Sequence, residues 1–246
     1  LSFTHIKETY NLMRTLVAGF AFVLPFSLTY HLVKGMPRKK PVKGWLAVLG
    51  GMLSGAAVSL AGHMHYVLYG LFGKVIKLSG YEDYWFPAST RYIGHNPETA
   101  DQCIHEFPSY SFVLGDLHAH VVNIMFVLLV IALLYVWLRG VRKKTVPVET
   151  SMKDGKFWKE QLLMPHLLVI SALLGMFQWT NFWDFVIYYV VTLGTVLFAN
   201  IIRFQGKIKK IIVVTFAQMA EIYLLAYLVI LPFTLQFDTM VDGIGI

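Results

Sequence analysis

Charged residues are scarce in this chain of 246 residues: Asp, Glu, Lys and Arg make up only 14% of it. A soluble domain carries about a quarter charged residues, so this shortage excludes an ordinary water-soluble enzyme. Cysteine is scarcer still, and the single Cys103 excludes both an internal disulfide and a zinc site built from cysteines alone. Hydrophobic residues make up 57% of the chain and aromatic residues 15%, which excludes disorder. An integral membrane protein is what remains.

Several familiar catalytic and nucleotide-binding motifs are also missing. The chain has no P-loop, no dinucleotide-binding glycine fingerprint, no Gly-x-Ser-x-Gly elbow and no His-Glu-x-x-His helix. Energy coupling by ATP within this chain is therefore not expected.

Long apolar runs dominate what is present. A membrane-spanning helix needs roughly 20 mostly apolar residues. Six segments qualify, at about 12–33, 45–70, 117–138, 162–179, 185–202 and 211–235. We therefore predict an all-α fold, a polytopic membrane helical bundle of about six transmembrane helices that forms a single transmembrane domain over residues 1–246.

The basic residues predict which loops are cytoplasmic. Five Lys and Arg residues lie between the first two spans, seven in the linker 139–161 and four between the last two spans, so that 16 of the 21 occupy alternate loops. By the positive-inside rule these loops face the cytoplasm, and the protein is expected in the cell (plasma) membrane. The long loop 73–115 then lies outside, and the net charge of +7 is a topology signal that implies no nucleic-acid partner.

The two ends of the chain suggest that more protein exists. Residue 1 is Leu, with no initiator Met and no signal-like basic start, and the final Gly243-Ile244-Gly245-Ile246 carries no stop-like tail. We expect this chain to be an interior piece of a longer polytopic protein.

Carboxylates and imidazoles concentrate where the outer loop meets the third span. Glu106 is followed by Asp116, His118 and His120, the last three spaced two residues apart. In an extended segment these three side chains point the same way, which suits a metal ion with nitrogen and oxygen ligands. In a helix only Asp116 and His120 share a face. The alternative is that Asp116 caps the third span while the two histidines place their polar tips in interfacial water.

Two further outer groups are candidates for ligand binding. Arg91 is a rare outward cation suited to bidentate capture of a phosphate, or else it pairs with a neighbouring acid. In the turn between the fourth and fifth spans, Asn181 and Asp184 could line the same cavity as Asp116. The alternative for this turn is an aromatic belt of Trp179 and Trp183, with Asp184 capping the fifth span.

Three other polar groups lie in or beside the spans. Glu221 lies near the middle of the sixth span, where a carboxylate is a functional hypothesis by default. His63 and His65 end the second span, and we expect neither to bind a ligand. The aromatic residues of the outer loop are expected to anchor in the headgroup layer: Tyr81, Tyr84, Trp85 and Phe86.

The order of these motifs resembles a known family. The run comprises Trp85, Ser89-Thr90-Arg91, Glu106-Phe107-Pro108, Ser111-Phe112, Gly115 to His120, Thr180-Asn181, Trp183-Asp184 and Leu231-Pro232-Phe233. It resembles the uncharacterised multi-pass membrane protein family of bacteria and archaea that is named YYY after a tyrosine run. That run and the acidic motif before it are absent here, and the resemblance places them upstream of Leu1, where the catalytic base of such an enzyme could also lie.

The YYY family is similar to the GT-C glycosyltransferases, and the resemblance implies a GT-C-like fold and activity. The expected reaction moves a sugar from a polyprenyl-phosphate-linked donor to an acceptor on the outer face, with membrane lipids as further partners and a divalent metal, Mg or Mn, as cofactor. Carried onto this chain, Asp116, His118 and Glu106 are the implied catalytic residues, and Asp116, His118 and His120 the implied metal ligands. The implied substrate-binding residues are Arg91, Thr180, Asn181, Trp183 and Asp184.

The sequence is also compatible with three other functions. One is a transporter or lipid flippase, with Glu221 and Arg91 on the translocation path. Another is a non-catalytic scaffold subunit whose outer loop docks a partner, and the third is a metal-dependent membrane hydrolase.

Overall fold

A computed structural model describes residues 5–37, 40–62, 66–77, 85–91, 93–95, 97–143 and 151–237. This part of the chain is helical, with no strand in it. It forms two compact units, Leu1–Val122 and Asn123–Ile246. The single transmembrane domain over residues 1–246 stays a prediction.

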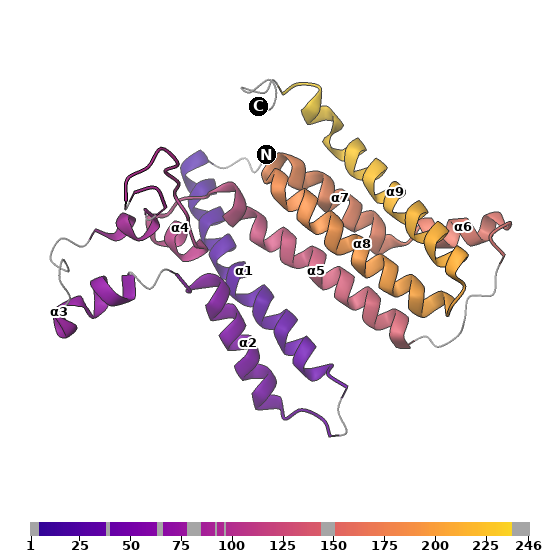
Figure 1. Ribbon diagram of the computed structural model, residues 1–246, viewed down its shortest axis with the longest axis horizontal. Helices are drawn as coiled ribbons and strands as arrows, with labels where there is room; N and C mark the ends of the chain where they lie inside the picture. Colours follow the sequence, from indigo (N-terminus) through magenta and orange to yellow (C-terminus); the bar gives the residue numbers. More distant parts are fainter. Residues whose placement is uncertain are drawn as a thin grey trace. The chain divides into compact units, whose positions relative to one another are not determined.

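The first unit is built on two antiparallel helices, α1 (Ile6–Lys34) and α2 (Gly44–Ser59), which pack along one another (Figure 1). Small residues let them approach closely. A Cβ atom on Gly51 would lie 2.8 Å from the Phe26 ring, and one on Gly55 would lie 2.8 Å from the Phe22 carbonyl oxygen. Glycines four residues apart on a membrane helix commonly serve this purpose.

Short helices follow α2 in the first unit. They are the π-helix η1 (Tyr66–Leu71), α3 (Gly73–Ile76), the 3₁₀ helix η3 (Phe86–Thr90) and α4 (Pro108–Leu114). The predicted outer loop 73–115 is thus partly helical. Proline begins α4 at its first position, and Gly115 ends it in the left-handed region at φ 75°, a conformation that glycine adopts without strain.

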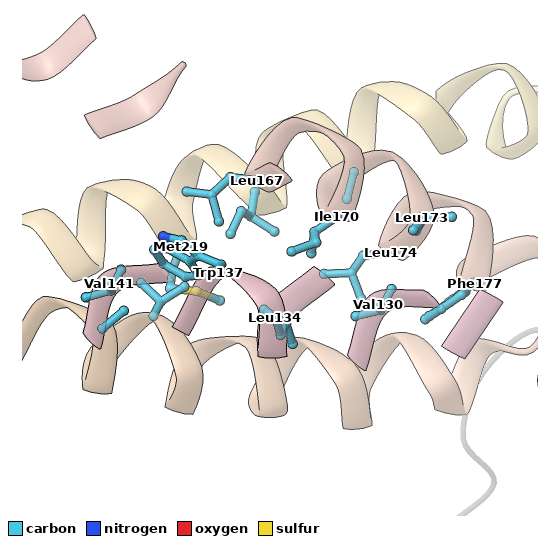
Figure 2. Packing of buried hydrophobic residues seen from close by; sticks show 14 residues of the cluster. Val130, Leu134, Trp137, Val141, Leu167, Ile170, Leu173, Leu174, Phe177 and Met219 are labelled. Carbon is cyan, nitrogen blue, oxygen red and sulfur yellow. The ribbon is translucent and has the colours of Figure 1, made fainter. Parts of the chain in front are cut away.

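The second unit is a bundle of α5 (Ala119–Lys143, which begins in the first unit), α7 (Pro165–Thr180), α8 (Phe182–Phe204) and α9 (Ile208–Thr234). Its core joins all four helices, and Figure 2 shows Leu134 and Trp137 of α5 beside Leu167, Ile170 and Leu174 of α7. Helix α7 also lies tightly against α9, since a Cβ atom on Gly175 would lie 2.6 Å from the Ala226 carbonyl oxygen.

The linker 139–161 contains a short helix, α6 (Gly155–Leu162). We predicted a solvated connector, but α5 runs on to Lys143 and α6 buries Phe157 and Gln161. The connector is therefore partly packed against the bundle.

Within the described ranges, four helices are long and apolar enough to cross a membrane: α1, α5, α8 and α9. The bent pair of α6 and α7, with an angle of 51° between them, makes a fifth if it is counted as one span. The prediction of six spans is therefore confirmed only in part. The second predicted span, 45–70, is the one that fails, because α2 ends at Ser59 after 16 residues and the chain leaves the helix there.

Candidate functional site

In the first unit, the imidazole of His118 lies between two carboxylates. His118 Nδ1 lies 2.7 Å from Glu106 Oε2, and His118 Nε2 lies 3.2 Å from Asp116 Oδ2. We call Glu106, His118 and Asp116 the carboxylate–histidine cluster. The sequence predicted these three residues as the catalytic group, and the structure brings them together.

The two carboxylates differ in access to solvent. The Glu106 side chain is 13% exposed and that of Asp116 49% exposed. A neutral imidazole has only one N–H, so both ring contacts are hydrogen bonds only when a second proton is present, either on the ring or on a carboxyl group.

A sharp turn delivers Asp116 and His118 to this position. The N–H groups of Gly115 and Asp116 both donate to the Ser111 carbonyl at the end of α4, at 2.8 and 2.9 Å. The His118 carbonyl then accepts the N–H groups of Val121 and Val122 at 3.0 Å, as α5 begins. Because α5 begins at Ala119, the interpretation of Asp116 as the cap of the third span is wrong.

Helix α1 holds the same turn through a residue that the sequence analysis did not identify. The Tyr10 hydroxyl donates to the Gly115 carbonyl and accepts the Leu117 N–H, both at 3.1 Å. These bonds hold the backbone on both sides of Asp116. Arg14, one turn further along α1, packs so closely on Gly115 that a Cβ atom there would lie 2.2 Å from its Nη1. No local sequence signal pointed to Tyr10, because its partners are more than 100 residues away.

The predicted metal ligands do not form one three-ligand group. Both ring nitrogens of His118 face carboxylate oxygens, and the His120 ring stacks on the His118 ring with centroids 5.8 Å apart. Across the described ranges, no three His, Cys, Asp or Glu side chains are arranged to hold a metal ion. The divalent metal, Mg or Mn, stays a prediction.

Arg91 lies in the first unit as well, directly after η3. Its guanidinium carbon is 5.1 Å from the centre of the Trp85 ring, and its Nη1 is buried without a hydrogen-bond partner. No carboxylate among the residues described here forms an ion pair with it. The His105 N–H donates to the Thr90 carbonyl at 3.2 Å, so Arg91 and Glu106 each adjoin the same backbone hydrogen bond.

An apolar cavity of about 560 Å³ lies in the same unit. Its walls come from α1, the end of α2, η1, η3 and α4, and include Phe22, Leu60, Phe86, Phe107, Phe112 and Val113. Two of the wall elements are followed directly by candidate site residues: η3 by Arg91, and α4 by the turn that carries Asp116.

The second unit holds the other predicted substrate-binding residues. Asp184 Oδ2 accepts hydrogen bonds from the amide groups of Asn123 and Asn181, at 2.5 and 3.0 Å. Thr180 donates to the Asn123 side-chain oxygen at 3.0 Å. Thr180, Asn181 and Asp184 thus form one group, and Asn123, fully buried on α5, is the member that the sequence analysis missed. A polar residue inside an apolar span needs a partner, and that signal could have identified it.

Asp184 and Trp183 lie at the start of α8. Helix α8 begins at Phe182, so Asp184 lies in its first turn and does not cap it. Trp183 is 72% exposed and contacts Phe182, which leaves its role in substrate binding a prediction. His63, His65, Tyr81 and Tyr84 lie outside the described residues.

Glu221 lies within α9, as expected. One of its carboxylate oxygens, Oε2, is buried without a hydrogen-bond partner.

Comparison with known proteins identifies the family. The chain belongs to the family described as uncharacterized membrane protein (DUF2298), whose model matches residues 1–246. Searches among curated proteins and among solved structures found no match to this chain. The prediction of an uncharacterised membrane-protein family is confirmed, and with four to five apolar helices the protein is an integral membrane protein. The similarity to GT-C glycosyltransferases stays a prediction.

Proposed function

Starting from membership of an uncharacterised membrane-protein family, we propose that the chain carries the catalytic site of a GT-C-like glycosyltransferase in the plasma membrane. The enzyme moves a sugar from a polyprenyl-phosphate-linked donor to an acceptor hydroxyl on the outer face, with the basic loops in the cytoplasm. One observation supports this proposal above the others: His118 lies between the mostly covered carboxylate of Glu106 and the exposed carboxylate of Asp116.

The cluster acts as the general base. Asp116, at the exposed end, accepts the proton of the acceptor hydroxyl as the new bond forms between the acceptor oxygen and the anomeric carbon of the sugar. His118 stabilises the proton that Asp116 has accepted. Glu106 fixes the orientation of the imidazole through its contact with Nδ1, a positioning role that carboxylates also have in other carboxylate–histidine pairs. Catalysis by a positioned base of this kind contributes roughly 10²–10⁴-fold to a rate.

Arg91 serves the leaving group. The bond between the anomeric carbon and the phosphate oxygen breaks, and the electron pair goes to the lipid phosphate. An arginine with a buried, unpartnered N–H group is suited to the negative charge that builds there, because such donors are already in place when the charge develops. Substrate binding by Thr180, Asn181 and Asp184 is a proposal for the second unit taken by itself. A divalent metal would supply further charge stabilisation where one binds.

The test is a transfer assay with the full-length protein in nanodiscs, a polyprenyl-phosphate-linked sugar and detection of released polyprenyl phosphate. Asp116→Ala and His118→Ala lower the rate of release by roughly 10²–10⁴-fold while the protein still inserts and purifies normally. Asp101→Ala, an exposed acid in the same outer segment, is the matched control and retains activity. Unchanged release in both Asp116→Ala and His118→Ala removes the cluster from the mechanism.

A second candidate function is transport or lipid flipping, favoured by the buried, unpartnered Oε2 of Glu221 within a membrane-spanning helix. A transporter of this kind depends on Glu221 and works without released polyprenyl phosphate. Two measurements therefore separate the functions: a transferase releases polyprenyl phosphate and keeps its rate in Glu221→Gln, whereas a transporter releases none and loses lipid transport across a vesicle membrane in Glu221→Gln.

A further inference from the structure

The cavity in the first unit has a chemical character that its composition alone does not show. Three serine side chains lie in its wall, at positions 59, 89 and 109. Each hydroxyl is already used as a donor to a nearby backbone carbonyl: Ser59 to Gly55 at 2.7 Å, Ser89 to Phe86 at 2.8 Å and Ser109 to Ala61 at 2.8 Å. These hydroxyl donors are therefore satisfied within the protein, which leaves a wall suited to hydrocarbon.

The size and the lining of the cavity fit a ligand. Ligand pockets commonly have volumes of about 300–1,000 Å³ and are lined mainly by apolar and aromatic side chains. This cavity of about 560 Å³ is within that range. Part of its aromatic lining is fixed by packing, because the Phe86 and Tyr110 rings stack with centroids 5.2 Å apart.

A cationic donor adjoins this apolar space along the chain. Phe86 and Ser89 of η3 line the cavity, and Arg91 is the residue that follows η3. Its Nη1 is buried without a hydrogen-bond partner, and burying such a donor is unfavourable unless it finds an acceptor. A ligand with a hydrocarbon chain and a terminal phosphate satisfies both the wall and the donor.

We infer that this cavity holds the hydrocarbon chain of a lipid phosphate whose phosphate group binds Arg91. This inference rests on the proposed function for the choice of lipid, which is the polyprenyl chain of the sugar donor. The cavity then fixes the reacting end of the lipid in the unit that carries the carboxylate–histidine cluster.

The test uses photolabelling of the full-length protein in nanodiscs with polyprenyl phosphate that carries a diazirine in its chain. Labelled peptides are identified by mass spectrometry, and we expect them to include the cavity wall on α4, residues 108–114. Ala18→Trp, which places a large ring in the cavity, lowers this labelling about tenfold or more. Val113→Trp also lowers the labelling about tenfold or more. Val113 lies at an exposed part of the wall, so the new ring does not enter the hydrophobic core. Val23→Trp, on the exposed side of α1, is the matched control and labels normally.

A second arm tests the phosphate contact. Arg91→Gln lowers labelling by polyprenyl phosphate about tenfold, in line with the loss of a charge-assisted hydrogen bond, and leaves labelling by the uncharged polyprenol unchanged. Equal effects on both probes overturn the role of Arg91 as a phosphate ligand.

Other outcomes decide the remaining parts of the inference. Normal labelling of α4 in both Ala18→Trp and Val113→Trp overturns the cavity as the binding site. Labelling by a diazirine phosphatidate that excess polyprenyl phosphate does not displace overturns the choice of lipid. Specific labelling in a protein that transfers no sugar supports the lipid site and refutes the transferase, so the two proposals fail separately.

Discussion

The Tyr10 hydroxyl offers a test of how the carboxylate–histidine cluster is held in place. Tyr10→Phe removes one oxygen that donates to the Gly115 carbonyl and accepts the Leu117 N–H. Each such bond contributes about 0.5–1.5 kcal/mol net. Because Tyr10 is 42% exposed, water replaces part of the loss. We therefore expect the local stability of the turn at Gly115–Leu117 to fall by about 1–1.5 kcal/mol.

Hydrogen exchange of the full-length protein in nanodiscs measures this change, followed by mass spectrometry on peptides that contain Leu117. A loss of about 1–1.5 kcal/mol accelerates exchange of the Leu117 amide roughly fivefold to tenfold, since 1.4 kcal/mol corresponds to a factor of ten. Tyr227→Phe is the control, because that tyrosine is similarly exposed and its hydroxyl has no hydrogen bond among the described contacts. Unchanged exchange at Leu117 in Tyr10→Phe would refute the role of α1 in holding the turn.

Three further predictions concern the second unit and use thermal unfolding in detergent. Gly175→Ala lowers stability by about 1–3 kcal/mol because the new methyl group meets backbone of the neighbouring helix, whereas Gly194→Ala, which opens onto free space, is neutral or stabilising. Asn200→Ala removes two buried hydrogen bonds to side chains of α9 and one partly buried bond from Arg203 of α8, and it lowers stability by at least about 1–3 kcal/mol; Thr195→Val, a partly buried residue of the same helix whose hydroxyl bonds only the Val191 carbonyl of that helix, changes it little. Asn123→Ala takes a donor from a carboxylate and lowers stability by about 1.5–3 kcal/mol, and an unchanged midpoint would contradict the hydrogen-bonded group at this end of the bundle.

The long apolar helices could be predicted from the sequence because hydropathy and length alone determine them. The predicted span 185–202 corresponds to α8 at Phe182–Phe204, and 211–235 to α9 at Ile208–Thr234. The break after Ser59 was not predicted, because residues 60–70 were counted with the apolar run before them although they include His63 and His65. It is visible only through tertiary contacts such as the Ser109 hydroxyl bound to the Ala61 carbonyl.

In the candidate site, too, some features could be predicted from the sequence and others could not. The concentration of acids and histidines near the third span drew attention to Glu106, Asp116 and His118, and the structure places these three side chains in contact. Ionisable groups beside hydrocarbon need partners. The metal-ligand interpretation of the spacing assumed that the three side chains point together, but a turn after Gly115 and the start of α5 at Ala119 aim them differently. The Tyr10 contact could not be predicted, because its partners lie more than 100 residues away in the sequence.

The central claim is that Glu106 and His118 act as one catalytic unit. A double-mutant cycle on the rate of polyprenyl phosphate release tests it most directly, with Glu106→Gln, His118→Ala and the double variant. Groups that act as a unit are strongly non-additive, so we predict that the double variant is no slower than His118→Ala alone. Losses that multiply, or a Glu106→Gln variant as fast as the unsubstituted protein, would contradict the account.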